Sequence, residues 1–255
     1  MNRSGGTERP PGRRDLARRL AQRALDLVFP RDCIHCHAPA DDQDYRFLCG
    51  RCAALLIRTV DPRCPTCGYP YWGKVEGPRT CHHCDHLNPV FQQGRTLWIH
   101  RGVSRTVMHH WKYRMGRYLD ADILTALRED ETLAGYLRNK VMVPVPLHRK
   151  RERNRGFNQS NRLAVLLRRV EPTLRQENLL ERVRDTPTQT RLDRTQRLKN
   201  VRKAFAIKAG HTVDAKISYL LVDDVFTTGA TLNECATVLR EYGATRIDVF
   251  TLAHG

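Results

Sequence analysis

Two adjacent aspartates and a threonine-rich loop follow one apolar run of the sequence. The stretch YLLVDDVFTTGATLNE covers residues 219–234, and its apolar run ends at Asp223 and Asp224. Ligands of parallel α/β sheets bind beyond the carboxyl ends of such strands. The loop precedes a predicted helix, so its backbone N–H groups can bind an anion, and Gly229 permits a close approach. The residues of this predicted anion site are Thr227, Thr228, Gly229, Ala230 and Thr231.

Two carboxylates directly before a phosphate-binding loop would repel a phosphate unless another group separates them. A ribose 5-phosphate meets this condition, because its hydroxyls can donate to Asp223 and Asp224 while its phosphate lies in the loop. Mg²⁺ can neutralise the remaining charge. The loop has no GxxxxGK[ST] pattern, so it is not the P-loop of nucleoside triphosphatases. The helix after it is predicted to begin with a capping box of Thr231 and Glu234 and to end at Gly243.

Eight of the nine cysteines form four CxxC pairs within one short segment. A CxxC pair brings two thiolates to one ion, and two pairs complete a tetrahedral site, so the segment predicts two structural zinc ions. Sequential pairing gives a double zinc ribbon and is preferred, while interleaved pairing stays open. His35, His37, His82, His83 and His86 either replace a ligand or are surface residues. The predicted ligands are Cys33, Cys36, Cys49, Cys52, Cys64, Cys67, Cys81 and Cys84.

The chain is strongly basic, with a formal net charge of +17 over 255 residues. This charge favours anionic partners, namely nucleic acid, phosphorylated small molecules or an acidic membrane face, or it reflects only a solvated arginine-rich surface. Residues 148–203 carry 17 Lys and Arg against 6 Asp and Glu. No apolar stretch reaches the length of a membrane span, and a cytoplasmic protein is expected.

The order of apolar and polar segments predicts three parts. Residues 1–30 read as a basic tail with an amphipathic helix, residues 31–90 as the double zinc ribbon and residues 91–255 as an α/β domain, in which 171–215 is expected to be a mobile loop region. Apolar strands separated by helices indicate a parallel sheet covered on both faces. No internal repeat is visible beyond the CxxC pairs. The main strands are expected at 95–102, 140–147, 217–224 and 245–253, and the helices at 103–130, 157–170 and 231–243.

Several motifs together resemble known families. LLVDDVFTTGAT closely resembles the phosphoribosyl-pyrophosphate (PRPP) signature of type I phosphoribosyltransferases. The chain resembles the ComF/GntX family from about residue 25 onwards. The resemblance rests on a zinc-ribbon front followed by VPVPLHRKRERNRGFNQ, TPTQTRLDRTQRLKNVRKAF and this signature. WKYRMG, residues 111–116, is similar to that family's LKY-type segment, with Trp in place of the usual Leu. The expected fold is therefore a parallel-sheet type I phosphoribosyltransferase-like α/β domain with a small N-terminal zinc-ribbon module.

The resemblance implies roles for individual residues. Asp223 and Asp224 would hold the ribose hydroxyls of Mg-PRPP, and Thr227 to Thr231 its 5′-phosphate. A loop after the strand at 140–147 would bind pyrophosphate, and residues 183–203 would close over PRPP. Asn158 and Gln159 either orient the ligand or cap the next helix. The candidates for these loop roles are Lys150, Arg151, Arg155, Gly156, Asn158, Gln159, Gln189 and Arg197.

The function that the resemblance implies is PRPP binding, with phosphoribosyl transfer to an acceptor that the sequence does not identify. It also implies a part in DNA uptake during natural transformation, with single-stranded DNA or the competence machinery as partners. The alternatives are a non-catalytic PRPP sensor or a single-stranded nucleic-acid-binding module on a transferase-derived fold. Tyr69, Tyr71 and Trp72 either stack on bases or pack against the zinc ribbon.

Overall fold

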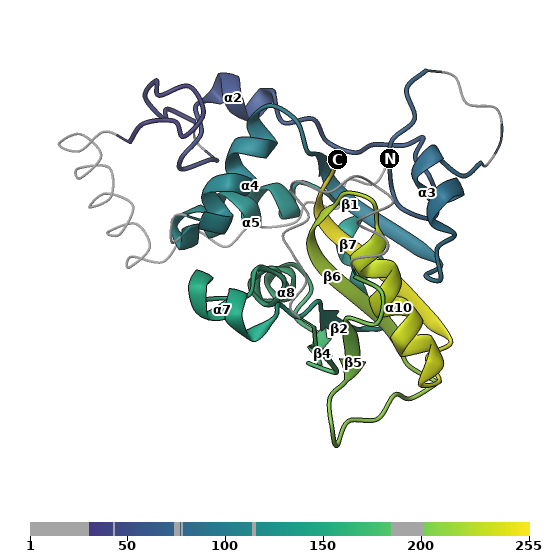
Figure 1. The fold of residues 1–255 in the computed structure, drawn as a ribbon. Helices are drawn as coiled ribbons and strands as arrows, with labels where there is room; N and C mark the ends of the chain where they lie inside the picture. Colours follow the sequence, from purple (N-terminus) through teal and green to yellow (C-terminus); the bar gives the residue numbers. More distant parts are fainter. Residues whose placement is uncertain (1–30, 43, 74–76, 78, 114–115, 185–200) are drawn as a thin grey trace, which may run out of the picture.

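The computed structural model describes residues 31–42, 44–73, 77, 79–113, 116–184 and 201–255. The helix predicted within residues 1–30 and the candidates Gln189 and Arg197 lie outside these ranges. Figure 1 shows a twisted sheet flanked by helices, with the cysteine-rich segment lying along one end of the molecule. No helix in the described part of the chain is both long enough and apolar enough to span a bilayer.

The core of the molecule is a five-stranded sheet with the order β1-β7-β6-β2-β3. Every pair of neighbouring strands in it is parallel. The central strands consist of continuous apolar runs because both faces of the sheet are covered. The prediction of a buried parallel sheet is therefore confirmed. The strands are β1 (Gln93–Ile99), β2 (Lys140–Pro144), β3 (Arg175–Gln176), β6 (Ser218–Phe226) and β7 (Arg246–His254).

Successive residues of each strand point to opposite faces of the sheet, and each face has its own core. On one face, Leu220 and Val222 of β6 pack with α4, α5 and α8. On the other face, Tyr219 and Leu221 pack with α10 and the second set of cysteines. The helices are α4 (Val103–Tyr113), η1 (Gly116–Leu119), α5 (Asp120–Arg128), α6 (Leu133–Leu137), α8 (Gln159–Val170) and α10 (Ala230–Glu241).

The region after β2 is more ordered than the sequence predicts. A short helix, α7 (Arg149–Arg155), stands where a loop is predicted, and it ends at Gly156 with a φ of 81°. The His148 ring accepts a hydrogen bond from the backbone N–H of Lys150 at the start of this helix, so the loop prediction is wrong at this point. Within residues 171–215, β3 joins the sheet, and β4 (Leu180–Arg182) pairs with β5 (Phe205–Ile207) as an antiparallel hairpin.

The cysteine-rich segment forms two units with the same local structure, here named the first ribbon (residues 31–56) and the second ribbon (residues 62–88). The backbone N–H of Cys33 donates to Ala38 at 2.7 Å, and that of Cys64 donates to Tyr69 at 2.7 Å. Each ribbon then ends in a short helix, α2 (Gly50–Ala54) or α3 (His82–Leu87). The two ribbons are thus an internal repeat, which the sequence shows only in its CxxC pairs.

The two ribbons dock on different parts of the α/β domain. In the first ribbon, the backbone N–H groups of Arg46 and Phe47 donate to the Asp122 carboxylate of α5, each at 2.8 Å. The second ribbon lies against β1, where a Cβ added to Gly68 would stand 2.9 Å from the carbonyl oxygen of Gly94. Figure 1 accordingly shows α2 beside α4 and α3 on the side of β1.

The segment between the ribbons runs along β1, which is an outer strand of the sheet. The backbone N–H of Thr59 donates to Leu97 at 3.0 Å, and Ile57 accepts from the N–H of Ile99 at 2.9 Å. The connection between the ribbons therefore extends the hydrogen bonding of the sheet by a short stretch.

Candidate functional site

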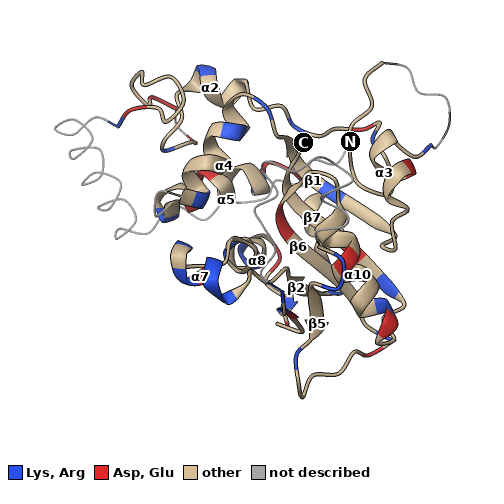
Figure 2. Ribbon diagram, in the orientation of Figure 1, with Lys and Arg blue, Asp and Glu red and all other residues tan. Residues whose placement is uncertain are grey.

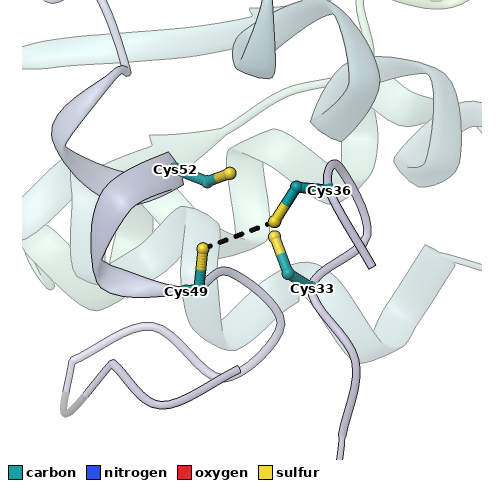
Figure 3. Close-up of side chains that lie close together, drawn as sticks. All are labelled: Cys33, Cys36, Cys49 and Cys52. Atoms are coloured by element: carbon teal, nitrogen blue, oxygen red, sulfur yellow. Dashed lines mark hydrogen bonds between the residues drawn. The ribbon is translucent and has the colours of Figure 1, made fainter. Parts of the chain in front are cut away.

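Four cysteine side chains meet in each ribbon. In the first ribbon, Cys33 and Cys36 come from a tight turn, and Cys49 and Cys52 from the start of α2 (Figure 3). The four sulfur atoms lie within 4.8 Å of one another, and the Sγ atoms of Cys36 and Cys49 are 3.6 Å apart. Zinc–sulfur bonds of about 2.3 Å in a tetrahedron place sulfur atoms roughly 3.8 Å apart, so these residues fit a zinc ion.

The second ribbon repeats this arrangement with a more buried cluster. Cys64 and Cys84 have their Sγ atoms 3.8 Å apart, and Cys67 and Cys81 have theirs 3.3 Å apart. Hydrogen bonds from Cys67, Cys81 and Cys84 lower the pKa of Cys64, and the hydrogen bonds to Cys64 raise the pKa of Cys67 and Cys84. Both clusters contain sequential CxxC pairs, so the preferred pairing is confirmed, and the clusters are consistent with two structural zinc ions.

The nearby histidines are not part of either sulfur cluster as the structure describes them. The Nδ1 atom of His35 lies 2.9 Å from the hydroxyl of Thr106 on α4. The rings of His82 and His83 pack near Tyr69, with centroid distances of 5.7 and 4.8 Å. His35 thus joins the first ribbon to α4, whereas His82 and His83 pack on Tyr69 within the second ribbon.

A cavity of about 240 Å³ opens at the carboxyl edge of the sheet, next to the predicted acid pair and loop. Figure 2 shows the acidic segment of β6 on the side of the sheet that the basic helix α7 faces. The cavity therefore has the acidic end of β6 on one side and a cationic wall, formed by basic residues of α4 and α7, on the other. Its lining includes Asp223, Asp224, Thr227, Gly229, Ala230 and Thr231 together with Lys112, Tyr113, Arg151, Arg155, Gln159 and Arg182.

The first acid of the pair is fixed by two hydrogen bonds. The carboxylate of Asp223 accepts from the hydroxyl of Ser160 at 3.0 Å and from the backbone N–H of Asp224 at 2.9 Å. Burial raises the pKa of Asp223 to about 7, and repulsion from the Asp224 carboxylate adds to the shift. Near neutral pH, Asp223 can therefore exist in either protonation state, and a cation in the cavity would favour the ionised one.

The second acid is paired with a lysine that the sequence analysis missed. The Nζ atom of Lys112 lies 2.9 Å from Asp224. The preceding residue, Trp111, is fully buried, and its Nε1 donates to Asp120 at 3.1 Å, which anchors the end of α4 that carries Lys112. Both members of the ion pair line the cavity, so Asp224 stays accessible to a bound group.

The loop after β6 turns into α10 at Gly229. This glycine has a φ of 74°, is the N-cap of the helix, and lets α10 begin at Ala230. The predicted capping box is wrong, because the helix starts before Thr231 and the Glu234 carboxylate accepts the backbone N–H of Lys203 instead. The N–H of Ala230, the first residue of the helix, donates to the hydroxyl of Thr228 at 3.4 Å. The start of α10 lies at the cavity, which Gly229, Ala230, Thr231 and Leu232 line.

The basic candidates after β2 do not all face the cavity. Arg151 and Arg155 line it, whereas Lys150 and Gly156 lie outside its lining. Asn158 is the N-cap of α8: its side-chain oxygen accepts the N–H of Ser160 at 2.9 Å, and its amide donates to the carbonyl of Val145 at 3.0 Å. Of the two alternatives for Asn158, the structure supports the cap.

Gln159 differs from its neighbour because it faces the cavity. Its side chain is almost fully buried, at 1% exposure, and lines the cavity beside the acid pair. Within the part of the chain that the structure describes, its Nε2 atom has no hydrogen-bond partner. A buried amide without a partner is costly, so this donor is available to a ligand.

Two residues that line the cavity, Lys112 and Arg182, and one that bonds to its acid pair, Ser160, escaped the sequence analysis. Lys112 lies in WKYRMG, a segment singled out only for its family likeness, and Ser160 lies in FNQSN, singled out as a helix start. Arg182 belongs to the hairpin of β4 and β5 and has no sequence signal of its own. Their roles depend on which elements fold beside β6, and a single strand–loop motif does not contain that information.

The fold and the two metal sites define a class of protein: a double zinc ribbon joined to a parallel α/β domain. Residues 24–85 match the double zinc ribbon domain family. A solved purine phosphoribosyltransferase from Pyrococcus horikoshii matches 55% of this chain and 84% of its own length, at 15% identity and a TM-score of 0.31.

Curated relatives define the family more closely. Competence protein F of Haemophilus influenzae is 30% identical over 210 residues, which cover 80% of this chain and 83% of that protein. Competence protein ComFC of Bacillus subtilis is 30% identical over 218 residues, with the same coverage of 80% and 83%. DNA utilization protein YhgH of Escherichia coli K12 is 30% identical over 234 residues and matches over 98% of its length. The chain belongs to this ComF/YhgH family.

Proposed function

We propose that the cavity at the carboxyl edge of the sheet binds Mg-PRPP. The observation that carries the proposal is the conjunction of an acid pair, a glycine turn and a helix start in one cavity. The sugar hydroxyls donate to Asp223 and Asp224, and the 5′-phosphate accepts from the N–H groups at the start of α10. This arrangement separates the phosphate from the carboxylates by the width of a ribose.

The diphosphate of PRPP needs positive charge on the opposite wall of the cavity. Arg151 and Arg155 of α7 and Lys112 of α4 line that wall and can make charge-assisted hydrogen bonds to phosphate oxygens. Asp223 and Asp224 are the residues that would hold Mg²⁺, which neutralises the charge of the diphosphate when it is bound. Lys112 balances Asp224 in the structure, and its ammonium group would be available to the diphosphate if that carboxylate held Mg²⁺.

If the protein turns PRPP over, the reaction is displacement of pyrophosphate at the anomeric carbon by an acceptor. The bond from C1 to the pyrophosphate oxygen breaks, and the acceptor supplies the electron pair for the new bond. The residues described above contribute orientation and charge stabilisation, without a covalent nucleophile. The mobile-loop assignment, with Gln189 and Arg197, is part of the same proposal.

Calorimetric titration with Mg-PRPP tests the binding site. Wild-type protein is expected to bind, and Asp223→Ala combined with Asp224→Ala is expected to abolish the heat signal while both zinc ions are retained. Zinc content and the melting temperature serve as controls for folding. Failure of the wild-type protein to bind Mg-PRPP would remove the proposal.

A second titration tests the cationic wall. Arg151→Gln with Arg155→Gln should weaken PRPP binding by roughly 100-fold or more, since each charge-assisted hydrogen bond contributes about 1.5–3 kcal/mol and a tenfold change in affinity is about 1.4 kcal/mol. The same variant should bind ribose 5-phosphate as the wild type does, because that ligand has no diphosphate. Lys150→Gln with Arg153→Gln removes equal charge from the same helix outside the cavity lining and is the matched control.

The names of the relatives, competence protein and DNA utilization protein, support a second function in handling DNA. The net charge of +17 is compatible with binding a polyanion. If single-stranded DNA is a partner, its affinity should fall steeply as salt rises, since binding releases counterions. Pyrophosphate release with bases or nucleic acids as acceptors separates an enzyme from a PRPP sensor.

A further inference from the structure

The second ribbon is packed directly against the loop that the proposed function assigns to phosphate. A methyl group added to Gly229 would collide with Cδ2 of Leu87 and Cζ of Phe226, so these two side chains lie against the α-carbon of the loop glycine. Leu87 is the last residue of α3, the helix that carries Cys84. Its side chain is buried, at 6% exposure. One apolar side chain therefore connects the metal cluster to the turn of the loop.

A chain of aromatic rings makes a second connection. Phe226, the residue before the loop, stacks on His254 at the end of β7, with 4.4 Å between ring centroids and 23° between planes. His254 in turn contacts Tyr69 and His83, each with a centroid distance of 4.8 Å. Tyr69 follows Cys67 by two residues, and His83 precedes Cys84. The rings thus join the end of β6 to both halves of the second metal cluster.

Hydrogen bonds after α3 make a third connection. The backbone N–H of Val90 donates to the side-chain oxygen of Asn233 on α10 at 2.7 Å, and the Arg240 guanidinium donates to the Val90 carbonyl at 3.1 Å. The segment that leaves the second ribbon is therefore fixed to the helix whose N-terminus forms the loop. The loop, α10 and the second ribbon share one core that includes all four cysteines of the second cluster.

Among the described residues of the first ribbon, none has a comparable position. The residue that corresponds to Leu87, three positions after the last cysteine of the ribbon, is Leu55, and it is 62% exposed. Three cysteines of the first ribbon belong to the core on the opposite face of the sheet, with α4, α5 and α8. The first ribbon thus provides an internal control for effects that come from zinc binding in general.

We propose that the second ribbon, through Leu87 and the ring chain, holds the loop of residues 227–231 in the conformation that binds phosphate. The phosphate affinity of the loop then depends on the metal cluster of the second ribbon and is independent of the first. Leu87 is a positioning residue: it touches the loop glycine and acts on the ligand only through the loop. This inference rests on the proposed function for the identity of the ligand.

The physical reason is that the loop backbone must hold several N–H groups in one direction. Gly229 is the residue of the loop that adopts a left-handed conformation, and glycine is also the residue with the greatest freedom to leave it. Without Leu87 against it, the turn samples other conformations. The apparent affinity then falls in proportion to the fraction of molecules with the competent loop.

The test compares Leu87→Ala with Leu55→Ala in the full-length, zinc-loaded protein. Hydrogen exchange of the peptides that cover residues 226–234 reports the loop without any ligand. We expect faster exchange in Leu87→Ala, unchanged exchange in Leu55→Ala, and restoration by Leu87→Met, which refills the space. Metal analysis should give two zinc ions per chain in all three variants. Unchanged loop exchange in Leu87→Ala with both zinc ions retained would overturn the inference.

Titration with ribose 5-phosphate then gives the functional outcome. Leu87→Ala should bind about tenfold more weakly, corresponding to a loop that is competent in roughly a tenth of the molecules, and Leu55→Ala should bind as the wild type does. If wild-type protein does not bind ribose 5-phosphate but Leu87→Ala still speeds loop exchange, the positioning role stands and the proposed ligand is wrong. Equal weakening in both variants would contradict the positioning role.

Discussion

The two ribbons have the same local structure but support different parts of the molecule. Each is closed by the same backbone hydrogen bonds and holds four sulfur atoms in the same arrangement. His37 of the first ribbon and Gly68 of the second both have positive φ, 61° and 77°, at the same point of the turn. Around these shared features, the first ribbon contacts side chains of α4 and α5, and the second contacts the backbone of β1 and the predicted phosphate loop. The CxxC turns determine the local fold of each ribbon. The other residues of the ribbon determine which part of the α/β domain it contacts.

Removing the metal site of one ribbon at a time should produce the largest difference between the two ribbons. Cys81→Ser with Cys84→Ser and Cys49→Ser with Cys52→Ser should each lose one of the two zinc ions, and a structural zinc contributes about 10–16 kcal/mol in isolated zinc-finger peptides. We expect only the Cys81 and Cys84 variant to lose ribose 5-phosphate binding, although both should melt at lower temperature. Metal analysis and calorimetry measure the two quantities. Loss of binding in both variants would show that the ribbons are not independent.

The turn residues of the ribbons provide the next test. Gly68→Ala places a methyl group against the backbone of β1 and imposes left-handed strain, so it should reduce the free energy of unfolding by about 2–5 kcal/mol. His37→Gly relieves the same strain at an exposed position, so it should leave stability unchanged or raise it by about 1 kcal/mol. Urea unfolding measures both variants. Similar losses in the two variants would mean that the ribbons meet their surroundings equally closely.

The contact that holds the first ribbon to α5 should have a smaller effect. Asp122→Ala leaves the backbone N–H groups of Arg46 and Phe47 without their acceptor, which should cost about 1–3 kcal/mol of unfolding free energy. Ribose 5-phosphate affinity should not change, because this contact lies on the side of the first ribbon. A change in affinity measured by titration would indicate coupling between α5 and the loop that the contacts do not predict.

The pH dependence of stability gives a further test and concerns the acid pair at the end of β6. The pKa of Asp223 is raised by burial to about 7, so the folded state binds this proton more tightly than the unfolded state does. The resulting stability is present below about pH 4 and is lost as the pH rises towards 7. Asp223→Asn should therefore raise the melting temperature at pH 8, with a gain that shrinks towards pH 4. A gain that is constant with pH would show that Asp223 does not titrate in this range.

Residues close together in sequence carried most of the correct predictions. The cysteine ligands and their sequential pairing follow from CxxC spacing, and the parallel sheet follows from apolar runs separated by helices. The loop at Gly229 was also recognisable, because a strand, a small-residue turn and a helix follow one another directly. The capping box was wrong since Gly229 can adopt a left-handed conformation that starts the helix early, and the sequence pattern of Thr231 and Glu234 does not reveal this.

Contacts between distant segments were not predictable in the same way. Lys112 reaches Asp224, and Leu87 reaches Gly229, from positions more than a hundred residues earlier in the chain. Each contact depends on the order of strands in the sheet and on where a ribbon docks. The strand order and the docking position of each ribbon depend on packing throughout the core, and no short motif in the sequence specifies them. The repeat of the two ribbons was not predicted for a related reason. Backbone hydrogen bonds define it, and most residue types can form them, so the two sequences need not be similar.

The segment that joins the ribbons has a consequence for the behaviour of the protein at high concentration. An uncovered outer strand is a template on which a second copy can add a strand, and proteins avoid this by shortening or covering such strands. Residues 57–59 occupy part of the free side of β1, and β3 at the other margin is only two residues long. Within the described sheet, neither margin offers a long surface for self-association. The connection between the two ribbons thereby shortens the part of β1 on which a second copy could add a strand.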